Sequence, residues 1–228
     1  MSSTVVAAIA PVIPGIDVSH HQRQVNWYLV AEAGIAFALA KATEGVSFVD
    51  PQFSANWIGI KNAGIIRGPY HFFRPARPVD AQVDNFARIV SEIRDGDLPP
   101  FLDLEEARTP NGDEWDDVPG DQRVPLVLRW LEGVEAKLGR RPIIYTRRSF
   151  VASELPNAAP LGQYLLWVAH YTTKPAPALP SAWSKWTFWQ SSAVGTVDGI
   201  SGPVDLDRFN GSSSDLEALT RIASSTSA

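Results

Sequence analysis

The chain has 228 residues, 45% hydrophobic and 20% charged, enough for one large domain with a sizeable core or for two small ones. Its formal net charge of −5 disfavours a nucleic-acid partner, and the absence of cysteine excludes disulfides, thiolate catalysis and cysteine metal sites. No segment reaches the roughly 20 apolar residues that a membrane span needs. Residues 1–13 lack the basic start of a secretory signal, so no signal peptide is recognisable.

Short apolar strand candidates alternate with helical stretches over the first two thirds of the chain. The first five expected strands cover residues 13–18, 36–42, 65–73, 101–105 and 142–146. The helices expected after them cover residues 25–33, 51–63, 79–94, 122–138 and 149–155. Three further strands are expected over residues 164–169, 186–191 and 204–207, joined by connections that are too weakly periodic for full helices.

Repeated strand–helix units of this kind predict an α/β fold with a parallel sheet. Eight strands can close into a barrel, so we expect a TIM-like barrel with eight strands and about five helices, an incomplete β/α barrel. The expected domain organisation is an N-terminal extension (1–12), a catalytic barrel (13–211) and a C-terminal helix or tail (212–228). The long loop 107–120 is of the kind that is often functional or mobile.

Two acidic residues, Asp103 and Glu105, lie in the apolar run 99–105. Side chains i and i+2 of a strand point to one face, with their backbones roughly 6.5–7 Å apart. Two such carboxylates cannot both ionise without cost, so one pKa rises, and an acid still protonated near neutral pH can act as a general acid. An exposed edge strand, or an ion pair with a neighbouring arginine, would explain the pattern without catalysis.

Two further acids are expected at the same end of the barrel. Catalytic residues of a β/α barrel lie at the carboxyl ends of its strands. Asp17 ends the first expected strand and Asp205 lies in the last, and these strands are neighbours in a closed barrel. Each alone could be a cap or a surface turn residue. Four carboxylates at one mouth predict a catalytic site, because buried acids in apolar strands are costly without a role or a partner.

Polar and aromatic side chains at the other strand ends are candidate substrate contacts. An ion pair with Lys41 would also explain Glu44, and core packing would also explain the tyrosines and tryptophans. The expected substrate-binding residues are Tyr70, Tyr145, Glu44, Trp167, Trp189 and Gln190. The four histidines show no metal-binding spacing and no GxSxG motif is present, so we expect no metal, no cofactor and no nucleophilic triad.

Six short motifs occur in order between about residue 13 and residue 211. They are GIDVS at 15–19, KATEG at 41–45, GPYHF at 68–72, LDLE at 102–105, WQ at 189–190 and VDL at 204–206, together with Gln22, Trp27, Phe37 and Phe209. This ordered set resembles glycoside hydrolase family 25, the Chalaropsis-type lysozymes or N-acetylmuramidases. The chain departs from the usual family pattern at 23–27 and at Asp207, where asparagine is usual.

The resemblance implies hydrolysis of the β-1,4 bond between N-acetylmuramic acid and N-acetylglucosamine in peptidoglycan. Glu105 matches the general acid of the family. Its acidic partners are matched by Asp17, Asp103 and Asp205. Retention is expected from the family, through a carboxylate nucleophile or through the N-acetyl group of the substrate itself. We favour the substrate-assisted route, with Asp103 steadying the N-acetyl group and Tyr70 or Tyr145 lining its pocket.

Two alternatives remain open, a chitinase-like hydrolase of N-acetylglucosamine polymers and a non-catalytic glycan-binding barrel. The flanking motifs favour the lysozymes over the chitinases, and the presence of Glu105 argues against a non-catalytic barrel. We expect bacterial peptidoglycan as the partner, no nucleic acid, no membrane span and a monomer. The expected place of action is the cell wall, outside the cell, with phage-type export as one route to it.

Overall fold

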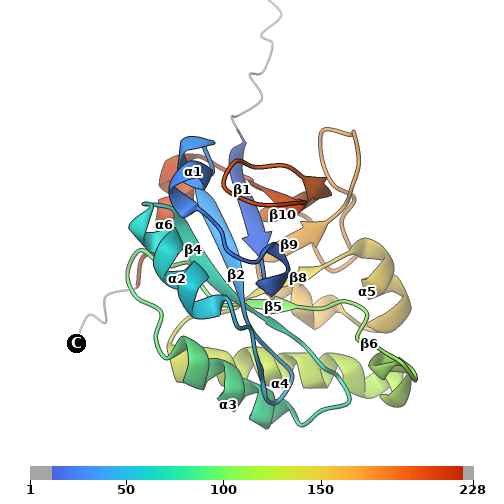
Figure 1. Ribbon diagram of the computed structural model, residues 1–228. Coiled ribbons are helices and arrows are strands. Elements are labelled where there is room, and N and C mark those ends of the chain that lie inside the picture. Colours follow the sequence, from blue (N-terminus) through green and yellow to red (C-terminus); the bar gives the residue numbers. More distant parts are fainter. Residues whose placement is uncertain (1–11, 223–228) are drawn as a thin grey trace, which may run out of the picture.

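The structure, a computed structural model, describes residues 12–222 and contains a closed barrel of eight strands (Figure 1). The barrel strands are β1 (Ile13–Val18), β2 (Phe37–Glu44), β4 (Ile66–Phe72), β5 (Phe101–Asp103), β8 (Ile143–Thr146), β9 (Leu166–Ala169), β10 (Phe188–Gly195) and β11 (Val204–Phe209). The barrel closes because β1 pairs with both β2 and β11. A short strand, β3 (Phe48–Val49), pairs with the end of β2. The predicted eight-stranded barrel is confirmed.

The strands run parallel around the barrel except for β11, which is antiparallel to both of its neighbours, β1 and β10. The expectation of a parallel sheet is therefore wrong for this strand. A parallel pair needs a crossover connection of a dozen or more residues, usually through a helix. Residues 196–203 between β10 and β11 are too few for such a crossover, so the chain turns back on itself.

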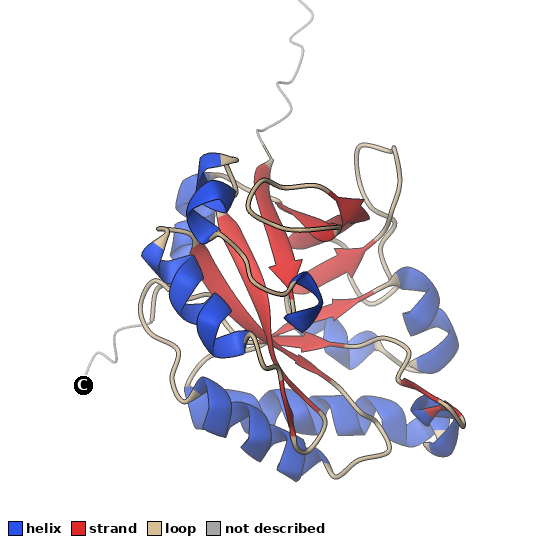
Figure 2. Ribbon diagram, viewed as in Figure 1, coloured by secondary structure: helices blue, strands red, loops and turns tan. Residues whose placement is uncertain are grey.

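Helices cover the outside of the barrel (Figure 2). The α-helices in the described part of the chain are α1 (Trp27–Glu32), α2 (Phe53–Asn62), α3 (Val79–Val90), α4 (Gly120–Leu138), α5 (Arg148–Glu154) and α6 (Ser213–Thr220). Three 3-10 turns are η1 (His20–Gln22), η2 (Glu114–Asp117) and η3 (Ala159–Gln163). Residues 107–120, expected as an irregular loop, contain η2 and a small hairpin of β6 (Arg108–Thr109) and β7 (Gly112–Asp113). No α-helix links β9 to β10, so the barrel is an incomplete TIM-like one, as predicted.

Large side chains fill the barrel interior below the mouth. Phe37, Phe101, Phe188 and neighbouring side chains form this cluster. Two glycines make room for it: a Cβ atom on Gly15 would lie 2.2 Å from the Phe37 ring, and one on Gly68 would lie 2.8 Å from the Phe101 ring. Because the interior is packed, the carboxyl ends of the parallel strands are where a cavity can open.

The ends of the chain bear on the expected domain boundaries. Apart from Val12, the expected extension of residues 1–12 lies outside the described residues, as do residues 223–228 of the expected tail. Helix α6 supplies the described part of the tail. The domain boundaries themselves stay predictions. Between residues 12 and 222, no helix combines the length and the apolar character needed to cross a membrane.

Candidate active site

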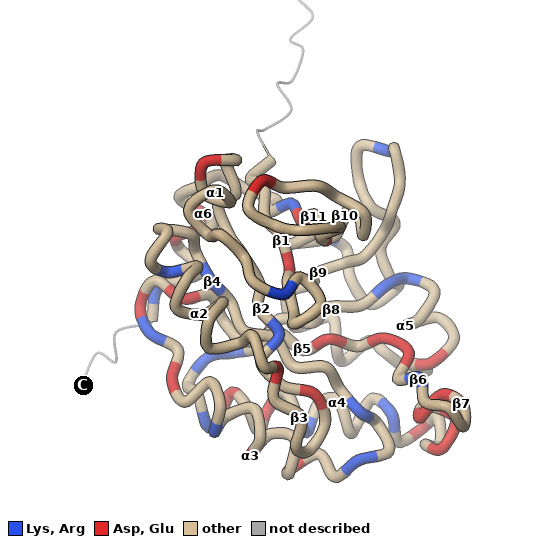
Figure 3. Tube along the Cα trace, in the orientation of Figure 1, with Lys and Arg blue, Asp and Glu red and all other residues tan. Residues whose placement is uncertain are grey.

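A cavity of about 400 Å³ opens at the barrel mouth. Eight of the ten predicted site residues line it. These are Asp17, Tyr70, Asp103, Glu105, Tyr145, Trp167, Gln190 and Asp205. Ser19, His21, Gln22, Lys41, Phe72, Tyr171 and Ala193 complete the wall. In Figure 3 the chain is red, for acidic residues, on β1 and where β5 ends.

Asp17 and Asp205 face each other because of the reversed direction of β11. The antiparallel register pairs them directly across β1 and β11. Asp205 therefore reaches the mouth from near the start of its strand rather than from a carboxyl end. Burial raises the pKa of both carboxyls, and repulsion from Asp207 and Asp205 adds to the effect at Asp17.

A chain of hydrogen bonds crosses the cavity wall through the Gln190 side chain. Its Nε2 donates to Asp17 Oδ2 at 2.7 Å. Its Oε1 accepts from the hydroxyls of Tyr145, at 2.9 Å, and of Tyr171, at 2.7 Å. Sequence reasoning missed Tyr171, which lies just after β9 and is 57% exposed. Tyr171 could have been identified in the sequence, because it follows His170 directly after an expected barrel strand.

Asp103 and Glu105 belong to different local structures. Strand β5 ends at Asp103, so Glu105 lies in the bend beyond it, and the expected strand over residues 101–105 is too long. Asp103 is 8% exposed, and its Oδ1 has no hydrogen-bond partner among the described residues. Burial raises the pKa of both carboxyls, and repulsion from Glu105 adds to the effect at Asp103. At Glu105 the opposing cations are Arg147 and Lys41.

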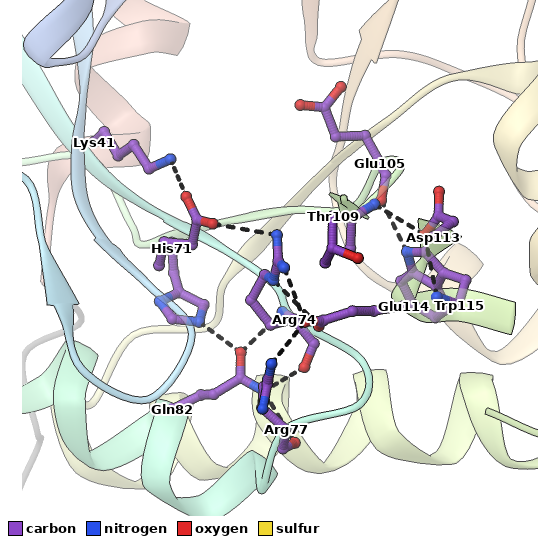
Figure 4. Close-up of polar contacts among 12 residues, drawn as sticks. Lys41, His71, Arg74, Arg77, Gln82, Glu105, Thr109, Asp113, Glu114 and Trp115 are labelled. Carbon is purple, nitrogen blue, oxygen red and sulfur yellow. Dashed lines mark hydrogen bonds and ion pairs between the residues drawn. The ribbon is translucent and has the colours of Figure 1, made fainter. Parts of the chain in front are cut away.

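Trp115 holds the bend that carries Glu105. Its indole Nε1 donates to the Glu105 backbone oxygen at 2.8 Å, while the Glu105 carboxylate points away from Trp115 (Figure 4). Trp115 itself is completely buried, and Asp113 Oδ1 accepts from its backbone nitrogen at 3.1 Å. The loop 107–120 therefore positions Glu105 through a buried donor, a contact that sequence reasoning did not identify.

We expect Trp115→Phe to lower kcat by roughly tenfold with little change in KM. Phenylalanine keeps an aromatic ring in the core but fills less of the space, and the Glu105 carbonyl loses its donor, a loss worth about 1–3 kcal/mol. Trp130→Phe is the matched control, because Trp130 is equally buried and its indole nitrogen has no partner in the described chain. Equal losses of kcat in both variants would show that packing, not the hydrogen bond, matters.

Glu44 belongs to an ion-pair network beside the cavity and does not line it. Its carboxylate pairs with Lys41 at 2.6 Å and with Arg74 at 3.4 Å. Arg74 in turn pairs with Glu114 at 2.8 Å (Figure 4). The network links the cavity-lining Lys41 to the start of η2. Glu44 is therefore placed to orient Lys41. Its position outside the cavity does not support the expected contact with substrate.

Trp189 points away from the cavity, although its neighbour Gln190 points into it. Adjacent strand residues face opposite sides. Trp189 is 1% exposed in the outer core and its Nε1 donates to the His170 backbone oxygen at 2.8 Å. His71 is likewise turned outward from β4, where burial lowers its pKa to about 3. Neither side chain is placed to contact a substrate at the mouth.

Asp207 is a further buried acid in the barrel. Its Oδ1 accepts from Trp167 Nε1 at 2.7 Å, and its Oδ2 has no partner among the described residues. Burial raises the pKa of Asp207 to about 8, so the carboxyl is neutral at neutral pH. A neutral carboxyl offers a carbonyl and a donor, much as the asparagine usual at this position in the resembled family would.

We expect Asp207→Asn to remove part of the pH dependence of stability. The folded-state pKa of about 8 exceeds the ordinary 3.9 of an unfolded chain, so the folded state holds the extra proton between these values. The stability that this proton contributes is then fully present below pH 4 and is lost as the pH rises toward 8. The Tm values of the two proteins should differ at pH 8 and converge at pH 4. Parallel Tm curves would contradict this.

A second cavity of about 480 Å³ adjoins the first. Glu105, Tyr145 and Tyr171 line both. The remaining wall of the second cavity comes mainly from α5, with Arg147 and Arg148, and from residues that follow β9. Glu105 thus lies where two hollows meet.

The barrel and its mouth define a class of protein: a glycoside hydrolase with an acid-lined cleft. Glycoside hydrolases commonly use a carboxyl group with a raised pKa together with a second carboxylate. Between residues 12 and 222, no group of three or more His, Cys, Asp or Glu side chains is arranged to hold a metal ion. The family model described as "Glycosyl hydrolases family 25" matches residues 16–200. The chain belongs to this family and is a glycoside hydrolase.

Similar proteins agree with this assignment. Lysozyme M1 of Streptomyces globisporus is 40% identical over 220 residues, covering 91% of this chain and 71% of the relative. The N,O-diacetylmuramidase of Chalaropsis sp is 32% identical, covering 85% and 96%. The crystal structure of the bacterial lysozyme from Streptomyces coelicolor superposes with a TM-score of 0.87 at 39% identity, covering 92% of this chain and 98% of that one. A family 25 lysozyme from Aspergillus fumigatus gives 0.83 at 30% identity, covering 92% and 99%.

Proposed function

We propose that the chain is a lysozyme that hydrolyses the β-1,4 bond between N-acetylmuramic acid and N-acetylglucosamine in peptidoglycan. The observation that carries this proposal is the position of Glu105 at the junction of two cavities, with its pKa raised by burial. A carboxylic acid in this place can protonate the oxygen that leaves the cleaved bond. The names of the relatives, lysozyme and muramidase, support the same substrate.

The proposed mechanism is retaining and assisted by the substrate. Glu105 gives its proton to the glycosidic oxygen as the bond from that oxygen to C1 breaks. The N-acetyl oxygen of the same sugar attacks C1 from the opposite face and forms a cyclic intermediate. A water molecule then gives a proton to Glu105 and opens the ring. Asp103 steadies the N-acetyl group, an assignment supported by its buried Oδ1, which has no partner in the described chain.

The remaining acids and aromatic residues are assigned to substrate binding. Asp17 and Asp205 face the cavity from the neighbouring strands. Tyr70 and Tyr145 are almost fully buried, so they offer rigid walls with polar tips at the mouth. A sugar at this place displaces water from a cavity in which Gln190 already orients the Tyr145 hydroxyl and the Asp17 carboxyl. Preorganisation of this kind lowers the cost of binding.

Mass spectrometry of the products tests the proposal. Purified peptidoglycan is digested with wild type, and the new ends are reduced and identified. Reducing ends on muramic acid are expected. Reducing ends on glucosamine would make the enzyme a glucosaminidase, and an absence of new reducing ends would contradict hydrolysis. Cleavage of chitin oligomers at a comparable rate would favour a chitinase-like enzyme instead.

We expect activity to be independent of divalent metals. The acid and the nucleophile of the proposed mechanism come from the protein and the substrate, so no step uses a metal ion. Dialysis against EDTA should leave the rate on purified peptidoglycan unchanged. A loss of activity that zinc restores would overturn the mechanism.

The proposed substrate places the action of the enzyme at the bacterial cell wall. The polymer is far larger than the cavity, so the enzyme works on a strand that passes across the barrel mouth. One barrel supplies every residue assigned to the mechanism, so we propose that it acts as a monomer. Light scattering during size-exclusion chromatography would test this, with a mass near 24.9 kDa expected.

A further inference from the structure

A third hollow, which we call the flank groove, lies between α1 and α2 on the outside of the barrel. It holds about 530 Å³ and shares no residue with the two cavities at the mouth. Its wall consists of Gln24, Val25, Asn26, Trp27, Tyr28, Gln52, Ala55, Asn56, Gly59, Asn62 and Gly199. The two helices that carry most of these residues lie side by side in Figure 1. The groove is therefore a separate site on the helical layer.

The lining of the flank groove is polar but carries no Lys, Arg, Asp or Glu side chain. Five of its residues are carboxamides, and each carboxamide offers both donors and an acceptor. Trp27 and Tyr28 are its aromatic residues, and the exposed Tyr28 provides a flat face. An ionic ligand would find no opposite charge here, and a purely apolar ligand would bury the carboxamides unpaired. The chemistry fits a neutral ligand that has both polar groups and flat C–H faces.

The Asn56 side chain lies in the groove with an amide that makes no hydrogen bond to the described part of the protein. It is 3% exposed, lines the groove, and its side chain has no hydrogen-bond partner in the described part of the chain. The amide atoms of Asn56 are not among the fully buried unpartnered atoms of the described chain, so solvent reaches them from the groove. A ligand in the groove would supply that partner.

The two aromatic residues of the groove differ in exposure. Trp27 packs against Gly59, where a Cβ atom would lie 2.2 Å from the indole. The absence of a side chain at Gly59 therefore lets the ring lie between the helices. Trp27 is 5% exposed and its indole nitrogen has no acceptor among residues 12–222, whereas Tyr28 is 66% exposed at the rim. The exposed Tyr28 ring beside the carboxamides suits the ring and the substituents of a sugar.

We propose that the flank groove is a second, non-catalytic binding site for N-acetylhexosamine units of a glycan. The inference rests on the proposed function, because it takes the glycan to be peptidoglycan. Acetamido groups match carboxamides in both donor and acceptor, and the neutral sugar ring matches the uncharged wall. A second contact with the same polymer raises the effective concentration of the strand at the barrel mouth without any new catalytic group.

The first test is a titration of the Glu105→Gln protein with the tetramer of N-acetylglucosamine, followed through the indole NMR signals. Trp27 reports on the flank groove and Trp167 on the mouth, each assigned by its own Phe variant. We expect the Trp27 signal to shift saturably. Asn56→Leu should weaken that binding by about tenfold and leave the Trp167 response unchanged. A Trp27 signal that stays still while Trp167 saturates would overturn the proposal.

Asn56→Leu also tests whether the carboxamide serves the fold instead. An amide without a protein partner, replaced by an apolar group of similar shape, should leave Tm unchanged or raise it. A large fall in Tm would show that Asn56 has a partner within the protein, and would contradict the proposal. Tyr28→Ala is the second variant, since an exposed rim residue can be replaced without loss of folding.

The last test compares binding to purified cell-wall sacculi with turnover of a short soluble glycan. Tyr28→Ala should weaken sacculus binding several-fold and leave soluble turnover unchanged. Leu29→Ala is the matched control, because Leu29 is an exposed neighbour on α1 that does not line the groove. If wild type and Tyr28→Ala bind sacculi equally well, the flank groove is not a glycan-binding site, and the proposed catalytic function is unaffected. Failure of wild type to cleave peptidoglycan would refute the proposed function instead.

Discussion

Glu105→Gln is expected to abolish turnover and leave the fold intact. The amide keeps the size and hydrogen-bonding shape of the side chain but has no proton to give to the leaving oxygen. General acid catalysis contributes about 10²–10⁴-fold, so kcat should fall by at least that factor. The Glu105 backbone oxygen would still accept from Trp115, so the bend should keep its position. Release of reducing ends from peptidoglycan measures the rate, and circular dichroism checks the fold.

Glu106→Gln is the matched control for this variant. Glu106 is the next acid in the chain, but it pairs with Arg147 and does not line either mouth cavity. Its replacement should leave the rate within a few-fold of wild type. If a correctly folded Glu105→Gln protein also stays within a few-fold, Glu105 is not the acid.

Most of the barrel was predictable because its strands are short apolar runs with helices between them. The boundaries of β1 agree with the expectation to the residue, and α2 and β4 agree to within two residues at each end. The direction of β11 was not predictable from its own residues. It depends on how the chain crosses residues 196–203, and the amino-acid pattern of a strand says nothing about which way its neighbour runs.

The sequence predicted which strand ends form the site. It did not always predict the direction in which each side chain points. Trp189 and Gln190 are adjacent, so only one of them can face the interior, and the sequence alone did not say which. Tyr171 and Trp115 lie in loops, where no period fixes a direction. They reach the site through hydrogen bonds to residues 19 and 10 positions away, and the tertiary structure determines these contacts.

Asp103→Asn is expected to slow the reaction by roughly 10²-fold and to move the alkaline arm of the pH profile to lower pH. The rate falls because the group assigned to the N-acetyl group loses its charge. The shift of the arm has a separate cause. Asp103 and Glu105 repel each other when both are ionised, so the second proton of the pair leaves at a higher pH than it would from Glu105 alone. Without Asp103, that repulsion is gone.

The sign of this shift follows from which form is active. The active form needs a proton on Glu105, so the alkaline arm reports the loss of the last proton from the pair. Burial still raises the pKa of Glu105 in the variant, and Arg147 and Lys41 still oppose that effect. The arm should therefore move down yet stay above the pH at which an exposed glutamate titrates. A slower enzyme with an unmoved alkaline arm would show that Asp103 orients the substrate but does not keep Glu105 protonated.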